Sequence, residues 1–156
     1  MHRFFVPPSW IRGERVTIEG PQAHQIRHVL RMHAGDHVLV LDNSGWEIET
    51  ELQLVESQEV MGRVVSRRLS TGEPRTKVSL YQGLLHPSDF RRLLTQGTRL
   101  GVVAFVPTIT DQSMLPLLGP DGRPEGESVW PELVRDAAEA AVRGRRPVLR
   151  AAMLFD

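Results

Sequence analysis

Cysteine is absent from this chain of 156 residues, and lysine occurs only once, at Lys77. Without thiols the chain can form neither disulfides nor thiolate metal sites. It also lacks any run of about 18 apolar residues, and the N-terminal MHRFFVPPSW lacks the apolar core of a signal peptide. These absences favour a soluble protein that spans no membrane, and we expect a cytoplasmic location.

Net charge is missing as well, because 19 basic residues balance 19 acidic ones. A strong nonspecific binder of polyanions is normally a net basic domain, so this class of protein is disfavoured. The positive charge is almost all arginine, whose planar guanidinium suits contacts to phosphates and base edges. Genomic bias or adaptation to heat also produces arginine-rich chains, so composition leaves both interpretations open.

The first 69 residues have the pattern of short strands with one helix among them. Apolar and acidic residues alternate over 46–54 (WEIETELQL), which predicts an antiparallel strand with one buried face. The buried face is expected to hold Trp46, Ile48, Thr50, Leu52 and Leu54. The other expected strands are 2–6, 15–18, 37–41 and 60–69. Five or more short strands around one helix predict a small β-barrel.

A polar stretch at 70–76 (STGEPRT) has no apolar anchor and is expected to be a linker. After it, the pattern changes to a βαβ unit with parallel strands. Its parts are a strand at 77–85, a helix capped by Ser88 or Asp89, and a strand at 102–106. A long polar loop, a helix at about 129–143 and a third strand at 148–155 follow. Three parallel strands and two helices make an incomplete α/β layer.

The stretch 24–36 (HQIRHVLRMHAGD) holds three of the six histidines. On a helix, one arc of about 100° would carry His24, Arg27, His28 and Arg31. The opposite, buried side would carry Ala23, Ile26, Val29 and Leu30. We call the first set the basic stripe. It is interpreted either as a phosphate-contacting surface or as an ordinary solvated helix face.

A metal site is the third interpretation of the same stretch, because a His-x-x-x-His pair on a helix can bind zinc. Zinc requires three or four ligands, yet there is no cysteine, and the nearest carboxylate, Asp36, follows a glycine in a turn. Two flanking arginines would repel a dication. We therefore expect no metal. The sequence also lacks the nucleophile-elbow, Walker and dinucleotide-binding motifs.

Several stretches, in this order along the chain, resemble the ribosomal RNA small-subunit methyltransferase E family. They are Arg3-Phe4-Phe5-Val6, His24 through Val29-Leu30-Arg31, Gly35-Asp36, and Leu80-Tyr81-Gln82-Gly83-Leu84-Leu85. The resemblance implies methylation of uridine N3 in 16S rRNA with S-adenosylmethionine. It also implies a PUA-like barrel joined to a knotted SPOUT domain that forms a homodimer. The expected fold class is thus α/β (α+β overall), with the barrel over 1–69 and an incomplete SPOUT-type parallel domain over 77–156.

The resemblance suggests site residues and partners. RNA contacts are expected from Arg3, His24, Arg27, His28 and Arg31. Two residues are candidates for catalysis: Arg143, which would project toward the target from the α/β half, and His86, which lies at a strand end. The implied partners are 16S rRNA or the small ribosomal subunit, and a second copy of the chain.

The second half departs from the family pattern. His86 stands in place of a lysine, Arg99-Leu100-Gly101-Val102 in place of Glu-Leu-Gly-Val, and Asp111-Gln112-Ser113 in place of Glu-Arg-Ser. Glu139 and Arg143 keep only the outer residues of Glu-Gln-x-x-Arg. The family's Gly-Pro-Glu-Gly-Gly and Ile-Leu-Arg-x-Glu-Thr-Ala stretches have no counterpart before Asp156. We therefore expect a divergent or truncated member that does not bind S-adenosylmethionine in the family's manner. The alternative is a non-catalytic RNA-binding or ribosome-associated module.

Overall fold

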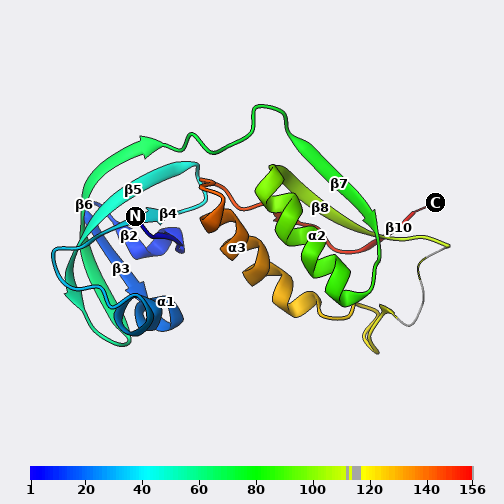
Figure 1. The fold of residues 1–156 in the computed structure, drawn as a ribbon, viewed down its shortest axis with the longest axis horizontal. Coiled ribbons are helices and arrows are strands. Elements are labelled where there is room, and N and C mark those ends of the chain that lie inside the picture. The colour runs from blue at the N-terminus through cyan, green and yellow to red at the C-terminus, as the bar shows by residue number, and fades with distance from the viewer. Residues whose placement is uncertain (112, 114–116, 156) are drawn as a thin grey trace. The chain divides into compact units, whose positions relative to one another are not determined.

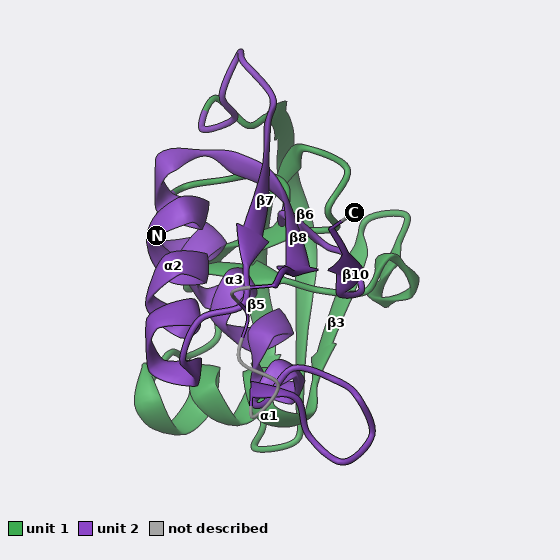
Figure 2. Ribbon diagram, turned by 90° about the vertical axis from the view of Figure 1, so that its right-hand side faces the viewer, with its two compact units in different colours: residues 1–71, 142–145 green, residues 72–141, 146–156 purple. Residues whose placement is uncertain are grey.

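The computed structural model describes residues 1–111, 113 and 117–155, which divide into two compact units (Figure 2). Unit 1 comprises Met1–Thr71 and Val142–Arg145, and unit 2 comprises Gly72–Ala141 and Arg146–Asp156. The first boundary falls inside the expected linker. The segment 142–145 joins unit 1, which differs from the expected division into 1–69 and 77–156. Two residues named in the sequence analysis lie outside the described residues: Gln112, from the stretch Asp111-Gln112-Ser113, and Asp156, the end of the expected second domain.

Unit 1 contains a six-stranded sheet in the order β1-β4-β5-β6-β3-β2 (Figure 1). β1 runs parallel to β4, and every other neighbouring pair is antiparallel. The strands are β1 (Arg3–Phe5), β2 (Ile11–Arg12), β3 (Arg15–Glu19), β4 (His37–Leu41), β5 (Trp46–Val55) and β6 (Glu59–Leu69). The sheet is curled into a half-barrel whose edges are β1 and β2, so the expected small β unit is present but does not close.

The core of unit 1 forms between the sheet and one short helical segment. Helix α1 (Gly20–His24) continues as a π-helical turn (Gln25–Val29). Ala23 and Ile26 on this segment are fully buried and pack with the apolar side chains of the strands. Each large apolar side chain that is fully buried stabilises the fold by about 1.5–3 kcal/mol. Gln22 Nε2 donates to the backbone oxygen of Phe5 at 2.9 Å and thereby joins α1 to β1.

The predicted burial of β5 is correct only in its middle. Ile48, Thr50 and Leu52 are buried, whereas Trp46 is 44% exposed and Leu54 is 38% exposed. A register shift between Leu52 and Leu54 leaves Gln53 as an extra residue in β5 and interrupts the alternation before Leu54, whereas the shift beside Glu49 and Thr50 places its extra residue, Val65, in β6. The sequence pattern carried no signal for these bulges.

Unit 2 contains a parallel sheet in the order β10-β8-β7, with β9 also pairing with β8. Its elements are β7 (Val78–Gly83), α2 (Pro87–Leu100), β8 (Val102–Ile109), α3 (Trp130–Ala140), β9 (Val148–Leu149) and β10 (Met153–Leu154). The predicted parallel βαβ arrangement is therefore confirmed. The single third strand expected over 148–155 was wrong, since two short strands flank 150–152. Among the described residues, no helix has the length and apolarity needed to cross a membrane.

The two helices of unit 2 pack beside each other against the sheet (Figure 1). The rings of Phe90 and Trp130 stack with centroids 4.5 Å apart. The residue before the first turn of α2 is His86, without a capping bond from its side chain, rather than Ser88 or Asp89 as predicted; Pro87 occupies the first turn, where a missing N–H costs nothing. Gly101 ends the helix at φ 100°, in the left-handed conformation that glycine adopts readily.

Candidate nucleic-acid interface

The helical segment after β3 brings both histidines of the basic stripe together. The ring centroids of His24 and His28 are 4.6 Å apart. His28 Nε2 lies 2.9 Å from the hydroxyl of Ser57, which follows β5. The stripe is thus anchored to the rest of unit 1 by a side-chain hydrogen bond as well as by its apolar face.

The π-helical turn changes the predicted geometry of the stripe. Leu30 N donates to Gln25 O at 2.9 Å, an i→i+5 bond that widens the turn. Arg31 consequently lies beyond the helix, at φ 53°. Val29 was expected to be buried but is 67% exposed, and Met32 joins the core in its place. The prediction assumed a regular 3.6-residue helix, which this segment is not.

Arg27 and Arg31 are exposed, and no ion pair is found for either of them within the described part of the chain. The nearby carboxylate of Asp36 accepts a hydrogen bond from His33 N at 2.8 Å. Two exposed guanidinium groups therefore lie in the same short stretch of chain as the two imidazoles. This arrangement can bind phosphate groups, because a guanidinium donates two parallel hydrogen bonds to phosphate oxygens.

Arg3 differs from the rest of the predicted RNA contacts. Its guanidinium forms an ion pair of 2.7 Å with Glu47, whose other carboxylate oxygen is 2.9 Å from Arg68. Burial raises the pKa of Glu47, but hydrogen bonds from Arg3, Arg68 and Ser70 outweigh that effect, so the pKa lies below its ordinary value. Arg3 thus connects β1 to β5, and its contact with RNA stays a prediction.

The two candidates for catalysis lie in different units. His86 is exposed at the start of α2, with Nδ1 2.9 Å from the hydroxyl of Ser88. Arg143 is only 2% exposed and belongs to the 142–145 segment of unit 1, although it was expected to project from the α/β half. Their predicted roles in catalysis are not tested by these positions.

At the described carboxyl edge of the parallel sheet, the hydroxyls of Thr110 and Ser113 are paired with each other. This edge is where α/β folds place ligands. Its described hydroxyls bond internally, since Thr110 N and Oγ1 contact Ser113 Oγ at 3.0 and 3.2 Å. Unit 2 also has a cavity of about 830 Å³, lined mainly by exposed residues that lie within 119–131 and 149–152. The described residues also contain no cluster of His, Cys, Asp and Glu suited to a metal ion.

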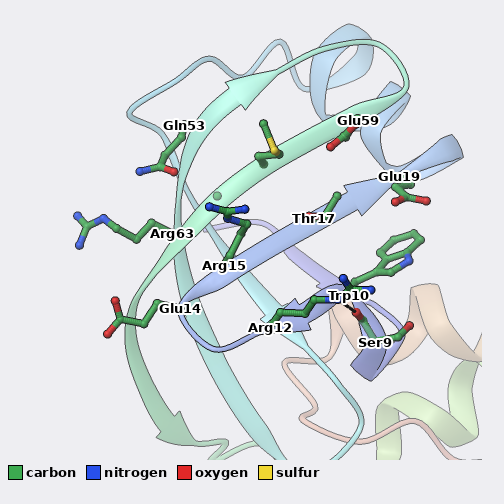
Figure 3. A pocket seen from close by; sticks show the side chains of 12 residues that line it. Ser9, Trp10, Arg12, Glu14, Arg15, Thr17, Glu19, Gln53, Glu59 and Arg63 are labelled. Carbon is green, nitrogen blue, oxygen red and sulfur yellow. Dashed lines mark hydrogen bonds between the residues drawn. The ribbon is translucent and has the colours of Figure 1, made fainter.

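Unit 1 also has a groove that the sequence did not predict. It has a volume of about 710 Å³ and crosses β2, β3 and β6 on the solvent face of the sheet (Figure 3). Three arginines contribute to its wall: Arg12, Arg15 and Arg63. The outward position of Arg15 could be inferred from the alternation in β3, but the pairing of β3 with β2 and β6 could not.

Two curated relatives of one name match the chain over nearly its whole length. Ribosomal RNA small subunit methyltransferase E of Bacillus subtilis is 28% identical over 150 residues, which cover 94% of this chain and 58% of that protein. The Synechocystis protein of the same name is 29% identical over 157 residues, which cover 99% of this chain and 48% of that protein. The chain therefore spans about half the length of the curated relatives it matches. No family model matches the sequence.

Solved structures share the fold. Ribosomal RNA small subunit methyltransferase E from Neisseria gonorrhoeae, bound to S-adenosyl methionine, superposes with a TM-score of 0.86 at 21% identity. The match covers 98% of this chain and 62% of that one. The predicted mixed α/β fold, with a curled β unit followed by a parallel sheet and helices, is confirmed.

Proposed function

We propose that the chain is a member of the ribosomal RNA small subunit methyltransferase E family and that it acts in the methylation of 16S rRNA with S-adenosylmethionine as the methyl donor. The observation that carries this proposal is the extent of the relationship, 94% and 99% of the chain against two relatives. The proposed target atom is N3 of a uridine, which follows from the resemblance of the sequence motifs.

RNA recognition is the part of this function that the described residues support best. The exposed guanidinium groups of Arg27 and Arg31 and the paired rings of His24 and His28 lie on one segment of unit 1. Such groups position an RNA backbone without reading its sequence. Arg3 contributes indirectly in this proposal: it fixes β1, and the carbonyl of Phe5 on β1 holds the side chain of Gln22 on α1.

The cofactor would supply an electrophilic methyl group, and the uridine N3–H must lose its proton to a base. His86 remains the proposed candidate for that base and Arg143 a proposed catalytic group. The proposed methyl transfer requires S-adenosylmethionine to bind, and isothermal calorimetry of this 156-residue chain measures that binding directly. Stoichiometric binding would support the methyltransferase, whereas the absence of saturable heat would favour the non-catalytic alternative.

A homodimer in the cytoplasm is the proposed state of the protein. Several large side chains of unit 2 are exposed, among them Tyr81 at 62%, Leu154 at 67% and Phe155 at 68%. Exposed apolar groups of this size are typical of interaction surfaces. Light scattering after size exclusion should give twice the mass of 17.6 kDa, and Tyr81→Lys should shift the protein toward a monomer. A monomeric wild type would exclude the dimer.

The decisive experiment for the function uses the protein in its own cells. The gene is deleted, 16S rRNA is digested to nucleosides, and N3-methyluridine is quantified by mass spectrometry. We expect the modified nucleoside to disappear and to return when the wild-type gene is restored. An unchanged amount after deletion would overturn the proposed activity.

The alternative function is a non-catalytic RNA-binding or ribosome-associated module. The departures of the second half from the family motifs, such as His86 in place of a lysine, favour it, since they concern the cofactor half and leave the basic stripe intact. In that case the deletion leaves N3-methyluridine unchanged, while the purified chain still binds rRNA.

A further inference from the structure

The groove on the solvent face of unit 1 contains a row of three arginines set by strand pairing. Arg12 on β2 pairs directly with Arg15 on β3, and Arg15 pairs with Arg63 on β6. All three side chains line the groove (Figure 3). Like charges placed directly opposite each other across antiparallel strands are destabilising. The row is therefore a local cost to the fold.

The surroundings compensate this cost only in part. Arg63 has a carboxylate partner, with Nη2 2.8 Å from Glu51 Oε2. Arg12 Nε reaches only the carbonyl of Ser9, at 3.4 Å. For Arg15, in the middle of the row, no ion pair or side-chain hydrogen bond is found among the described residues. An anion over Arg15 would relieve the repulsion on both sides.

The opposite end of the groove has the reverse charge. Glu19 on β3 pairs directly with Glu59 on β6, and both line the groove. Glu19 lies four positions after Arg15 on β3, which corresponds to about 13 Å along the strand. Between the two ends, Thr17 pairs with Met61, and Trp10 borders the same space (Figure 3). The groove is thus bordered by three arginines and Glu14 at one end, by two glutamates at the other, and by an indole.

We propose that this groove binds a nucleotide of single-stranded RNA, with a phosphate over the row of Arg12, Arg15 and Arg63 and the base toward Glu19 and Glu59. Carboxylates accept hydrogen bonds from an exocyclic amino group such as cytosine N4, which uracil lacks. Trp10 offers an aromatic surface beside the base. This site is separate from the basic stripe and does not depend on methyl transfer, so it goes beyond the proposed function.

The test measures binding of fluorescein-labelled oligocytidylate and oligouridylate octamers by anisotropy, over a range of salt concentrations. We expect the wild-type chain to bind oligocytidylate more tightly than oligouridylate. Arg15→Gln should weaken both complexes about tenfold and reduce the salt slope by about one, because the variant neutralises one phosphate fewer. Glu19→Gln should remove the preference for cytidine and leave the affinity for oligouridylate unchanged.

Two controls keep the result specific. Arg99→Gln removes an exposed arginine of α2, outside the groove, and should change neither affinity nor slope. Thermal unfolding of Arg15→Gln should show a Tm no lower than that of wild type, since the substitution relieves repulsion between like charges. Wild-type affinity and slope in Arg15→Gln would overturn the proposal, as would equal affinity of the wild type for both octamers. Neither result would affect the deletion experiment, so this inference and the proposed function fail independently.

Discussion

The guanidinium of Arg145 donates from Nε and Nη2 to the backbone oxygen of Ser44, at 3.1 and 2.7 Å, although 101 positions separate the two residues. The neighbouring Gly144 is packed equally closely: a Cβ there would lie 2.5 Å from Ser70 Cβ and 3.1 Å from Gly45 O. The segment 142–145 is thus fastened to the turn before β5 and to the end of β6. Unit 1 is completed by residues from late in the chain.

Gly144→Ala should destabilise unit 1, because its methyl group would overlap Ser70 and the backbone of Gly45. We expect a decrease of about 1–3 kcal/mol in the free energy of unfolding, the usual cost of overpacking. Urea unfolding followed by circular dichroism measures it. Gly83→Ala is the matched control, since its Cβ would meet no atom closer than 3.9 Å. Equal stability of the two variants would show that the segment yields without cost.

Glu47→Gln should be more damaging than the same change at an exposed glutamate. Glu47 is 3% exposed and balances Arg3, which is itself only 12% exposed. Removing the carboxylate leaves a largely buried guanidinium without its partner, at a cost of about 3 kcal/mol. Glu51→Gln breaks the more exposed pair with Arg63 and should cost about 0.5 kcal/mol or less. Similar decreases in the stability of both variants would contradict the structural role assigned to Glu47.

The same carboxylate predicts how stability depends on pH. Hydrogen bonds to Glu47 hold its folded pKa below its unfolded value despite burial, and those from Ser66 and His37 do the same for Glu49. A lowered pKa stabilises the folded state fully above the unfolded pKa of about 4.3, and this stability is lost as the pH falls through the folded value. Unfolding free energies measured from pH 7 down to 3 should therefore fall, and less steeply in Glu47→Gln. Identical slopes would exclude this linkage.

Local sequence patterns predicted where helices and strands occur better than they predicted which side chains are buried and which strands pair. The strand at 37–41 and the βαβ unit followed from apolar runs and turn residues, which act within a few positions. The burial of Glu47 could not be predicted, because it depends on Arg3 and Arg68, which other strands supply. The π-helical turn and the return of 142–145 to unit 1 depend on packing rather than on periodicity. The pairing of the groove's arginines could not be predicted either, because it depends on the register between strands, which a single sequence does not show.

The basic stripe makes the final prediction, which concerns RNA affinity rather than stability. Arg27→Gln/Arg31→Gln removes two exposed charges that have no ion-pair partner among the described residues. The double variant should bind a 16S rRNA fragment at least tenfold more weakly, and its salt slope should fall by about two, one for each phosphate that an arginine no longer neutralises.

Arg91→Gln/Arg92→Gln on α2 is the control for net charge, because it removes two exposed arginines from unit 2. If both double variants bind equally weakly, the effect is one of overall charge and the stripe is no specific surface. Unchanged affinity and slope in Arg27→Gln/Arg31→Gln would remove the stripe from the RNA interface, because an arginine that neutralises a phosphate also sets how many counterions the RNA releases.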